Sequence, residues 1–378
     1  MRYDVVIVGA GIAGCGLAYN LKRLGYKGSV LVIDKEKLNV KNKSYRITFK
    51  DTVEKYKLPY EKDYSYLKFH LPGGEIIDIK VKSFLLEYGK TCKFLLQNSD
   101  CEFRNEQAIN VKESNLVSDK SSYDFKYLID CSGNNFFVKR LLGETLPMKY
   151  WVGFSKILES QNNRVRSFHY FFHEDGCFED IYQVKDELMY GYWKYTNDAD
   201  LKLEGESRYD FVENLIEGKK VIKKFVNVVP CAPMFPLIKE KIAFLGDSFG
   251  NATTSSAEGI KPILDSSEIL AEAIMQSDLK FYERVWKDRY LNSYIRFLAL
   301  KMARYPDSPF WKSLKERFLP KNLAIYDYLK KDPYTLFKIL RNDGSFEMPA
   351  EFKKCFSKLN YVILASIYLN LKLKYAMM

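Results

Sequence analysis

The stretch Tyr3–Leu24, YDVVIVGAGIAGCGLAYNLKRL, joins an apolar strand to an apolar helix through a turn with three glycines. The run Tyr3–Val8 predicts a buried parallel strand. A second apolar strand, Ser29–Ile33, ends in Asp34, which lies 20 residues after Gly14. This order of strand, glycine turn, helix, strand and acid predicts a dinucleotide-binding unit at the start of an α/β fold.

Each position of the turn has a physical role. Gly9 makes the tight turn, Gly11 lets the backbone approach a pyrophosphate, and Gly14 lets the helix lie close to the strand. The helix N-terminus favours the phosphates, and the Asp34 carboxylate accepts bonds from ribose hydroxyls. The expected contacts at this end of the cofactor are Gly9, Ala10, Gly11, Ile12, Ala13, Gly14, Asp34 and Lys35.

The composition is that of a globular protein with an excess of basic over acidic residues. The chain has 378 residues, a net charge of +11, 28 tyrosines and 26 phenylalanines. Such a charge indicates an acidic partner, either nucleic acid or an anionic lipid surface, and a general lysine bias is the alternative explanation. Because no Lys/Arg-rich arm or zinc-binding spacing is present, we expect no nucleic-acid partner.

The cysteines and histidines do not form a site. Seven cysteines are scattered without a CxxC pair, and the three histidines have no metal-ligand spacing. We therefore expect no metal. The first strand begins almost at the N-terminus, so we also expect reduced thiols, no targeting peptide and a cytoplasmic protein.

In the rest of the chain, stretches in which apolar and polar residues alternate, as in strands, are interspersed with stretches of helical periodicity. Strands are expected at 66–71 and 76–81, joined by the turn Pro72-Gly73-Gly74, and a helix is expected at 83–98. Residues 151–195 are rich in aromatics and predict an antiparallel sheet. Further strands are expected at 101–104, 108–112, 115–118, 125–129 and 241–245, and mainly helix after residue 258.

Two later motifs accompany the first. Residues 128–139, LIDCSGNNFFVK, follow an apolar strand, and residues 242–250, IAFLGDSFG, precede SAEGI at 256–260. With the glycine turn, they resemble FAD enzymes of the p-hydroxybenzoate-hydroxylase-like fold, and within them the archaeal geranylgeranyl reductase family. The resemblance covers roughly residues 3–275 and implies FAD as the cofactor.

The resemblance implies a Rossmann-like FAD-binding domain of residues 1–60, 83–145 and 235–278, with a parallel sheet and helices. An antiparallel substrate sheet of residues 61–82 and 146–234 and a C-terminal helical region, 279–378, complete the expected architecture. In the family, the Asp of the third motif holds the ribityl chain, and the turn after it opens a helix towards the flavin. The further cofactor contacts implied are Arg46, Lys90, Gly133, Gly246, Asp247, Glu258, Gly259 and Ile260.

The implied activity is reduction of carbon–carbon double bonds in an isoprenoid, a prenyl lipid or a prenylated quinone. The family's Cys-Gly-Asp is replaced here by Ser44-Tyr45-Arg46-Ile47-Thr48, and its YxWxFP strand is echoed by residues 190–195. No side chain is clearly the proton donor. The candidates to line the pocket are Tyr45, Arg46, Tyr192 and Trp193.

Two other functions remain open. An FAD-dependent monooxygenase acting on an aromatic or lipid-like substrate would share all three motifs, and a lipid-binding flavoprotein fold without activity is the other alternative. The expected partners are an apolar, lipid-like substrate and an electron donor, either NAD(P)H or a redox protein.

The C-terminal segment also has two interpretations. The apolar run Tyr361–Leu371 is flanked by lysines and is about half the ~20 residues that a spanning helix needs. It fits either a helix lying on an anionic membrane surface or a helix packed on the body of the protein.

Overall fold

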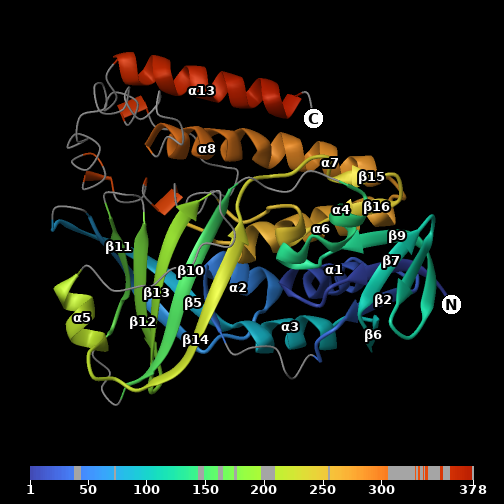
Figure 1. Cartoon of the computed structure of the whole chain (residues 1–378), viewed down its shortest axis with the longest axis horizontal. Coiled ribbons are helices and arrows are strands. Elements are labelled where there is room, and N and C mark those ends of the chain that lie inside the picture. The colour runs from blue at the N-terminus through green and yellow to red at the C-terminus, as the bar shows by residue number, and fades with distance from the viewer. Residues whose placement is uncertain are drawn as a thin grey trace.

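Two eight-stranded β-sheets form the frame of the computed structural model, with most of the helices beside the first sheet (Figure 1). The structure describes residues 1–37, 44–71, 74–143, 149–160, 165–173, 177–196, 209–253, 256–304, 328, 331–332, 335, 337–338, 350–351 and 358–376. Two residues of the expected turn, Pro72 and Gly73, lie outside the described residues.

The first sheet has the order β15-β16-β9-β1-β2-β6, with the β7–β8 hairpin attached to β9. β1 pairs in parallel with β2 and β9, and β16 joins β9 in parallel. Val5, Val6 and Ile7 are fully buried, as a central parallel strand requires. The strands are β1 (Arg2–Val8), β2 (Val30–Asp34), β6 (Glu102–Asn105), β7 (Ala108–Lys112), β8 (Asn115–Ser118), β9 (Ser122–Asp130), β15 (Ile238–Lys239) and β16 (Ile242–Phe244).

The first sheet and its helices come from distant parts of the chain. Helix α1 lies against both α3 and α6. A Cβ on Gly16 of α1 would lie 2.7 Å from Leu264 Cδ2 of α6, so this glycine allows the two helices to approach closely. The expected discontinuous α/β region is confirmed. The helices are α1 (Ile12–Arg23), α2 (Lys50–Tyr56), α3 (Tyr88–Gln97), α4 (Phe137–Leu141), α6 (Ile260–Met275) and α7 (Leu279–Trp286).

The second sheet has the order β14-β10-β13-β12-β11-β4-β5-β3. Its neighbouring strands are antiparallel apart from β11 and β4, which are parallel. The antiparallel character expected for residues 151–195 is therefore confirmed. The strands are β3 (Tyr45–Phe49), β4 (Lys62–His70), β5 (Ile76–Glu87), β10 (Tyr150–Glu159), β11 (Phe168–Phe172), β12 (Phe178–Val184), β13 (Glu187–Thr196) and β14 (Val221–Pro230).

Two expectations about the first hundred residues need correction. The helix predicted from residue 83 begins only at Tyr88, because β5 continues to Glu87. Phe84 and Leu86 pack into the core of the first sheet while Leu85 packs into the core of the second, an alternation that only a strand provides. In addition, β3 pairs with β5 in the second sheet, although the expected FAD-binding segment 1–60 contains it. The other domain boundaries stay a prediction.

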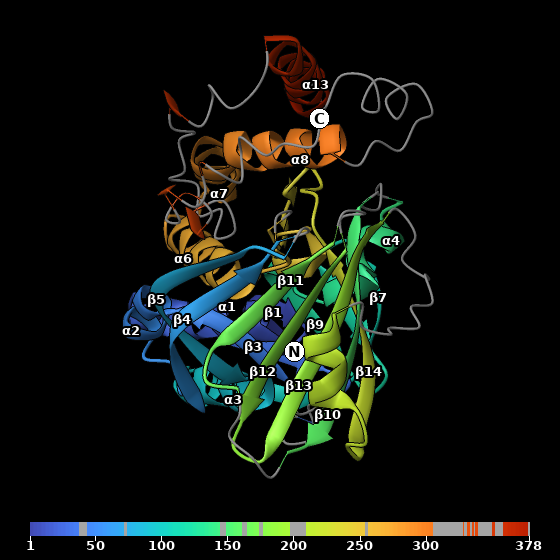
Figure 2. The same cartoon turned by 90° about the vertical axis from the view of Figure 1, so that its left-hand side faces the viewer.

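Helices α8 (Asn292–Arg304) and α13 (Lys358–Ala376) lie on one side of the molecule, with α13 outermost in both views (Figures 1 and 2). Ile367, Leu371 and Tyr375 of α13 are buried in the core of the first sheet, as the packed-helix interpretation expects. No helix among the described residues is both long and apolar enough to cross a membrane. The remaining short elements are η1 (Gly133–Asn135), α5 (Asp210–Ile216), η2 (Gly246–Ser248) and η3 (Lys287–Leu291).

Candidate cofactor and substrate site

The glycine turn is shaped by close contacts within the protein. Gly9 has a φ of +105°, and a Cβ there would lie 2.2 Å from the carbonyl oxygen of Cys131. A Cβ on Gly14 would lie 1.9 Å from the carbonyl oxygen of Gly9. Both positions therefore need glycine for the turn and the helix to form at all.

Gly11 differs from the other two glycines because its neighbour is a side chain. A Cβ there would lie 2.8 Å from the hydroxyl oxygen of Tyr88, which begins α3. The same hydroxyl accepts a hydrogen bond of 3.2 Å from the backbone N–H of Ile12, in the first turn of α1. The Tyr88 hydroxyl thus stands where an oxygen acceptor meets this helix N-terminus, which is the position expected for a phosphate.

Asp34 is held rigidly at the end of β2. Its Oδ2 accepts the N–H of Ala10 at 2.7 Å, and its Oδ1 accepts the N–H of Glu36 at 2.8 Å. Ala10 therefore contributes its backbone to the site, although its side chain is fully buried in the core. The ribose contact expected of Asp34 stays a prediction.

Two cavities adjoin these elements. The first, the fingerprint cavity, has a volume of about 520 Å³ and is lined by Gly9, Gly11, Asp34 and Lys35. The second, the aromatic cavity, has a volume of about 400 Å³ and lies against the second sheet. They share six lining residues: Arg46, Tyr88, Gly133, Phe225, Val226 and Asn227. The two cavities therefore adjoin each other at these residues.

The second and third motifs meet at the edge of the first sheet. The buried Asp130 carboxylate accepts the N–H groups of Ser132 and Val138 at 3.0 Å each, which fixes the loop that carries Gly133. The hydroxyl of Ser248 donates to the carbonyl oxygen of Asp130 at 2.5 Å. This hydrogen bond joins the loop around Asp247 to the end of β9, the strand that pairs with β1 beside the glycine turn.

Gly246 and Asp247 occupy the position between α1 and the aromatic cavity. Gly246 has a φ of +76°, and a Cβ on it would lie 2.7 Å from the Cβ of Ala13. Asp247 lines the aromatic cavity, where burial raises the pKa of its carboxyl to about 6 against the opposing charge of Arg46. Gly246 and Ala13 therefore act through packing, whereas Asp247 faces the cavity.

The turn before α6 also borders the aromatic cavity, through Glu258, Gly259 and Ile260. The Glu258 Oε1 accepts the N–H of Lys261 at 3.0 Å, and the Glu258 N–H donates to the hydroxyl of Thr253. These bonds fix the start of a 16-residue helix, whose N-terminus favours negative charge.

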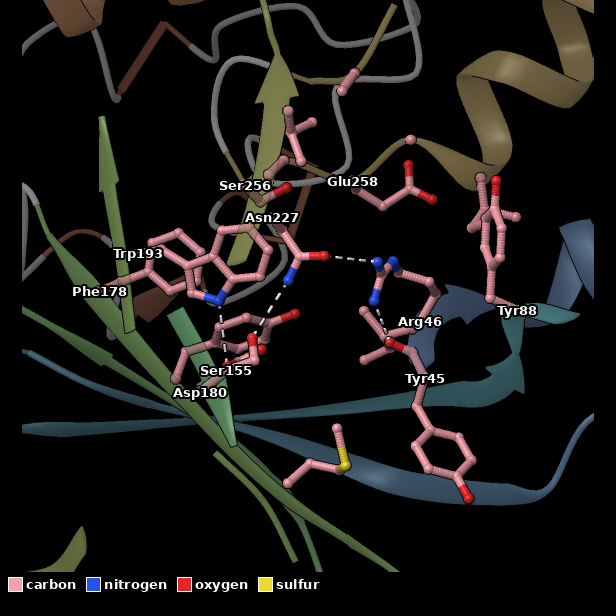
Figure 3. Close-up of a pocket in the computed structure, with 18 of the residues that line it drawn as sticks. Tyr45, Arg46, Tyr88, Ser155, Phe178, Asp180, Trp193, Asn227, Ser256 and Glu258 are labelled. Atoms are coloured by element: carbon pink, nitrogen blue, oxygen red, sulfur yellow. Dashed lines mark hydrogen bonds between the residues drawn. The ribbon is translucent and has the colours of Figure 1, made fainter. Parts of the chain in front are cut away.

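Arg46 of β3 lines both cavities, and its guanidinium points towards Asn227 (Figure 3). One guanidinium nitrogen donates to the Tyr45 carbonyl oxygen at 2.9 Å, and the other donates to Asn227 Oδ1 at 3.1 Å. The Asn227 amide in turn donates to the Ser155 hydroxyl at 3.4 Å. Asn227, Ser155 and Tyr88 were not found from the sequence, because they come from strands and a helix start that no motif marks.

The wall of the aromatic cavity comes largely from the second sheet. The Phe69 and Tyr170 rings stack at 5.2 Å, and the Phe178 and Trp193 rings stack at 5.9 Å with an interplanar angle of 11°. The aromatic residues of the wall include Phe69, Phe168, Tyr170, Phe178, Tyr182 and Trp193. This wall suits an apolar ligand.

Two expected site residues lie elsewhere. Tyr192 packs on the opposite face of the second sheet, in a core with Leu188 and Val212, because neighbouring residues of a strand point to opposite faces. Lys90 lines neither cavity, and its Nζ lies 2.5 Å from Glu61 Oε1. By contrast, the structure brings Tyr45, Arg46 and Trp193 together at the aromatic cavity.

Among the described residues, no group of three or more His, Cys, Asp or Glu side chains is placed to hold a metal ion. The cysteines in this part of the chain form no disulfide bond with one another.

Comparisons with known proteins agree with this geometry. Residues 4–46 match the family of FAD dependent oxidoreductases. The chain is 26% identical over 140 residues to the chloroplastic geranylgeranyl diphosphate reductase of Nicotiana tabacum, and 31% identical over 101 residues to the enzyme of Synechocystis. These alignments cover 34% and 24% of this chain, and only 30% and 25% of the two relatives.

Solved structures resemble almost the whole chain. A geranylgeranyl bacteriochlorophyll reductase-like protein from Thermoplasma acidophilum has a TM-score of 0.71 at 14% identity, over 97% of this chain and 98% of that one. The flavin-dependent brominase Bmp2 has a TM-score of 0.69 at 14% identity, over 100% of both chains. The fold is that of FAD-dependent oxidoreductases and monooxygenases, and FAD is the cofactor that the residues of this site fit.

Proposed function

We propose that this chain reduces carbon–carbon double bonds of an isoprenoid, a prenyl lipid or a prenylated quinone. The observation that carries the proposal is the aromatic cavity, which adjoins the fingerprint cavity and shares six lining residues with it. An apolar chain in it would lie against aromatic side chains, beside the expected flavin end of FAD. Burial there contributes roughly 25 cal/mol per Å² of apolar surface.

The residues that would hold FAD fall into two groups. The ADP half would lie in the fingerprint cavity, bordered by Gly9, Gly11, Asp34 and Lys35. The flavin half would lie at the aromatic cavity, bordered by Ile12, Gly133, Asp247, Glu258, Gly259 and Ile260. FAD supplies the two-electron chemistry when it is bound, and the N-terminus of α6 favours negative charge beside it.

The chain's own side chains would bind the substrate and exclude water. The aromatic wall would remove water from the reacting end of the site, and Arg46, held by its bond to Asn227, would lie between the two cavities. The electron donor is left open between NAD(P)H and a redox protein.

We also propose peripheral contact with an anionic membrane through α13. Ile367 and Leu371 face the core, but Leu369 and Leu373 are exposed by 58% and 63%. The net charge of +11 would favour such a surface. Liposome sedimentation at low and high salt tests this, since a protein that stays in the supernatant at low salt does not bind.

The second candidate function is an FAD-dependent monooxygenase that hydroxylates an aromatic or lipid-like substrate. Its support is the fold shared with PqsL, described as a probable FAD-dependent monooxygenase from Pseudomonas aeruginosa, at a TM-score of 0.61 and 13% identity.

One experiment separates the two functions. Reduced protein is incubated without oxygen with geranylgeranyl lipids and prenylated quinones, and the products are analysed by mass spectrometry. The proposal predicts products that have gained pairs of hydrogen atoms. Products that form only after oxygen is admitted, and that have gained an oxygen atom, contradict it and favour the monooxygenase.

A further inference from the structure

The charges around the aromatic cavity are unequal. Its charged lining residues are one cation, Arg46, and three carboxyl groups, those of Asp180, Asp247 and Glu258. The fingerprint cavity differs, since three cationic residues there face three acidic ones: Lys35, Arg46 and Lys223 against Asp34, Glu36 and Glu106. The side-chain charges, apart from the N-terminus of α6 that borders the same cavity, therefore disfavour an anionic ligand group in the aromatic cavity more than in the fingerprint cavity.

Asp180 is the carboxyl group that belongs to the second sheet. Its Oδ1 accepts the indole N–H of Trp193 at 3.3 Å, and no other side-chain partner of Asp180 is found in the part of the chain that the structure describes (Figure 3). Trp193 itself stacks on Phe178. A single carboxyl group is thus held against an aromatic wall, with capacity for further hydrogen bonds from a ligand.

Two glycines make room for this arrangement. Gly191 lies opposite Asp180 in the β12–β13 pair, and a Cβ there would lie 2.1 Å from Asp180 Oδ1. Gly153 lies opposite Trp193 in the β10–β13 pair, and a Cβ there would lie 2.4 Å from the indole ring. The position of Asp180 is therefore built into the sheet.

The environment of Asp180 raises the pKa of its carboxyl. Burial raises the pKa of its carboxyl to about 6, against the Trp193 hydrogen bond and the charge of Arg46, which lower it, while the neighbouring Glu179 raises it. Asp247 lines the same cavity, and the pKa of its carboxyl is also raised to about 6. Tyr170 and Tyr182 also lie near Asp180, and its charge contributes to raising the pKa of both phenols.

We propose that Asp180 selects substrates whose polar head is neutral or cationic and donates a hydrogen bond, such as an alcohol, a phenol or an amine, and disfavours anionic heads such as diphosphates. The inference rests on the proposed function, because it takes the aromatic cavity as the place of an apolar substrate. Asp180 is then a specificity-determining residue that touches the substrate's head.

The test measures binding of geraniol, geranylamine and geranyl diphosphate to the FAD-loaded protein by calorimetry at pH 8. The wild-type protein should bind the amine and the alcohol at least about tenfold more tightly than the diphosphate. Asp180→Asn keeps the shape of the side chain and should weaken amine binding about tenfold. Asp78→Asn is the matched control, because Asp78 lies on the same sheet, pairs with Lys68 and lines neither cavity.

The pH dependence gives a second measurement. Between pH 8 and pH 5 the Asp180 carboxylate takes up a proton while geranylamine stays cationic, so amine binding should weaken in the wild type and change less in Asp180→Asn. Equal affinities for the three compounds, or an Asp180→Asn variant that binds the amine as the wild type does, would overturn the inference and leave the proposed function standing. Failure of all three compounds to bind contradicts the proposed function itself.

Discussion

The fingerprint cavity and the aromatic cavity adjoin, yet they are built from different kinds of structure. The fingerprint cavity is lined by the glycine turn, the ends of β1 and β2 and the loop after β9, together with residues of β14. The aromatic cavity is lined by side chains from β3, β4, β11, β12, β13 and β14 of the second sheet. Backbone geometry therefore decides what the first cavity binds, and side-chain identity decides it in the second. Substitutions in the two cavities should therefore differ in how strongly they affect FAD retention and substrate binding.

The largest effect is expected from Gly11→Val in the fingerprint cavity. A side chain there meets the Tyr88 hydroxyl and the space for the pyrophosphate, so purified protein should be folded by circular dichroism and carry no FAD. Gly11→Ala combined with Tyr88→Phe is the control, because it removes the hydroxyl that the new methyl group would meet. If the double variant keeps FAD fully, the loss came from the Tyr88 contact and not from the pyrophosphate.

Asp247→Ala should weaken FAD retention by about 1–3 kcal/mol, which is the usual cost of losing a hydrogen bond to a charged group. Equilibrium dialysis of FAD against wild type and variant measures this. An unchanged affinity would mean that Gly246 and Asp247 only form the turn after β16.

In the aromatic cavity, Trp193→Phe should weaken the binding of geranylgeraniol by about 1 kcal/mol and leave FAD retention unchanged, because it reduces the apolar wall. Tyr192→Phe is the matched control, because Tyr192 lies next to Trp193 on the opposite face of the same strand. It should change neither geranylgeraniol binding nor FAD retention. Calorimetry measures the binding of geranylgeraniol and of FAD. If Tyr192→Phe weakens geranylgeraniol binding as much as Trp193→Phe does, the face of β13 assigned to the cavity is wrong.

The buried carboxyl group of Asp247 should make the protein without FAD less stable as the pH rises. A folded-state pKa raised to about 6 gives a contribution that is fully present below the unfolded value of 3.8 and is lost as the pH passes about 6. Asp247→Asn should therefore melt about 2 °C above the wild type at pH 8, with a smaller difference at pH 5. A constant difference across this range would show that the carboxyl group does not titrate there.

The smallest effect is expected from Lys90→Ala, which should leave FAD retention unchanged. Lys90 is exposed and paired with Glu61 and Glu87, and such surface pairs contribute about 0–1 kcal/mol. Arg46→Ala, at the junction of the cavities, should weaken FAD retention by contrast. The two variants are compared in the same dialysis experiment, and a loss of FAD from Lys90→Ala contradicts the site as described.

The same contrast explains what could be predicted from the sequence. The turn at Gly9–Gly14 and Asp34 could be predicted because backbone geometry imposes fixed residue types at fixed spacing, whereas the segment around Asp247 was predicted from the family resemblance. The wall of the aromatic cavity was found only in part, because strand pairing brings residues such as Tyr88, Asp180 and Asn227 together from distant positions without a local motif. Lys90, which only the family resemblance suggested, lies on the expected helix but pairs with Glu61 and Glu87 and lines neither cavity.

The proposed function requires that an apolar substrate bind in the aromatic cavity, beside FAD bound in the adjoining cavity. The most direct test is to titrate geranylgeraniol into the FAD-loaded protein while recording the visible absorption spectrum of the flavin and, in parallel, the heat of binding. The account predicts a saturable change of the flavin spectrum with the same midpoint as the heat. Binding heat with an unchanged flavin spectrum would contradict it, because the ligand would then lie away from the cofactor.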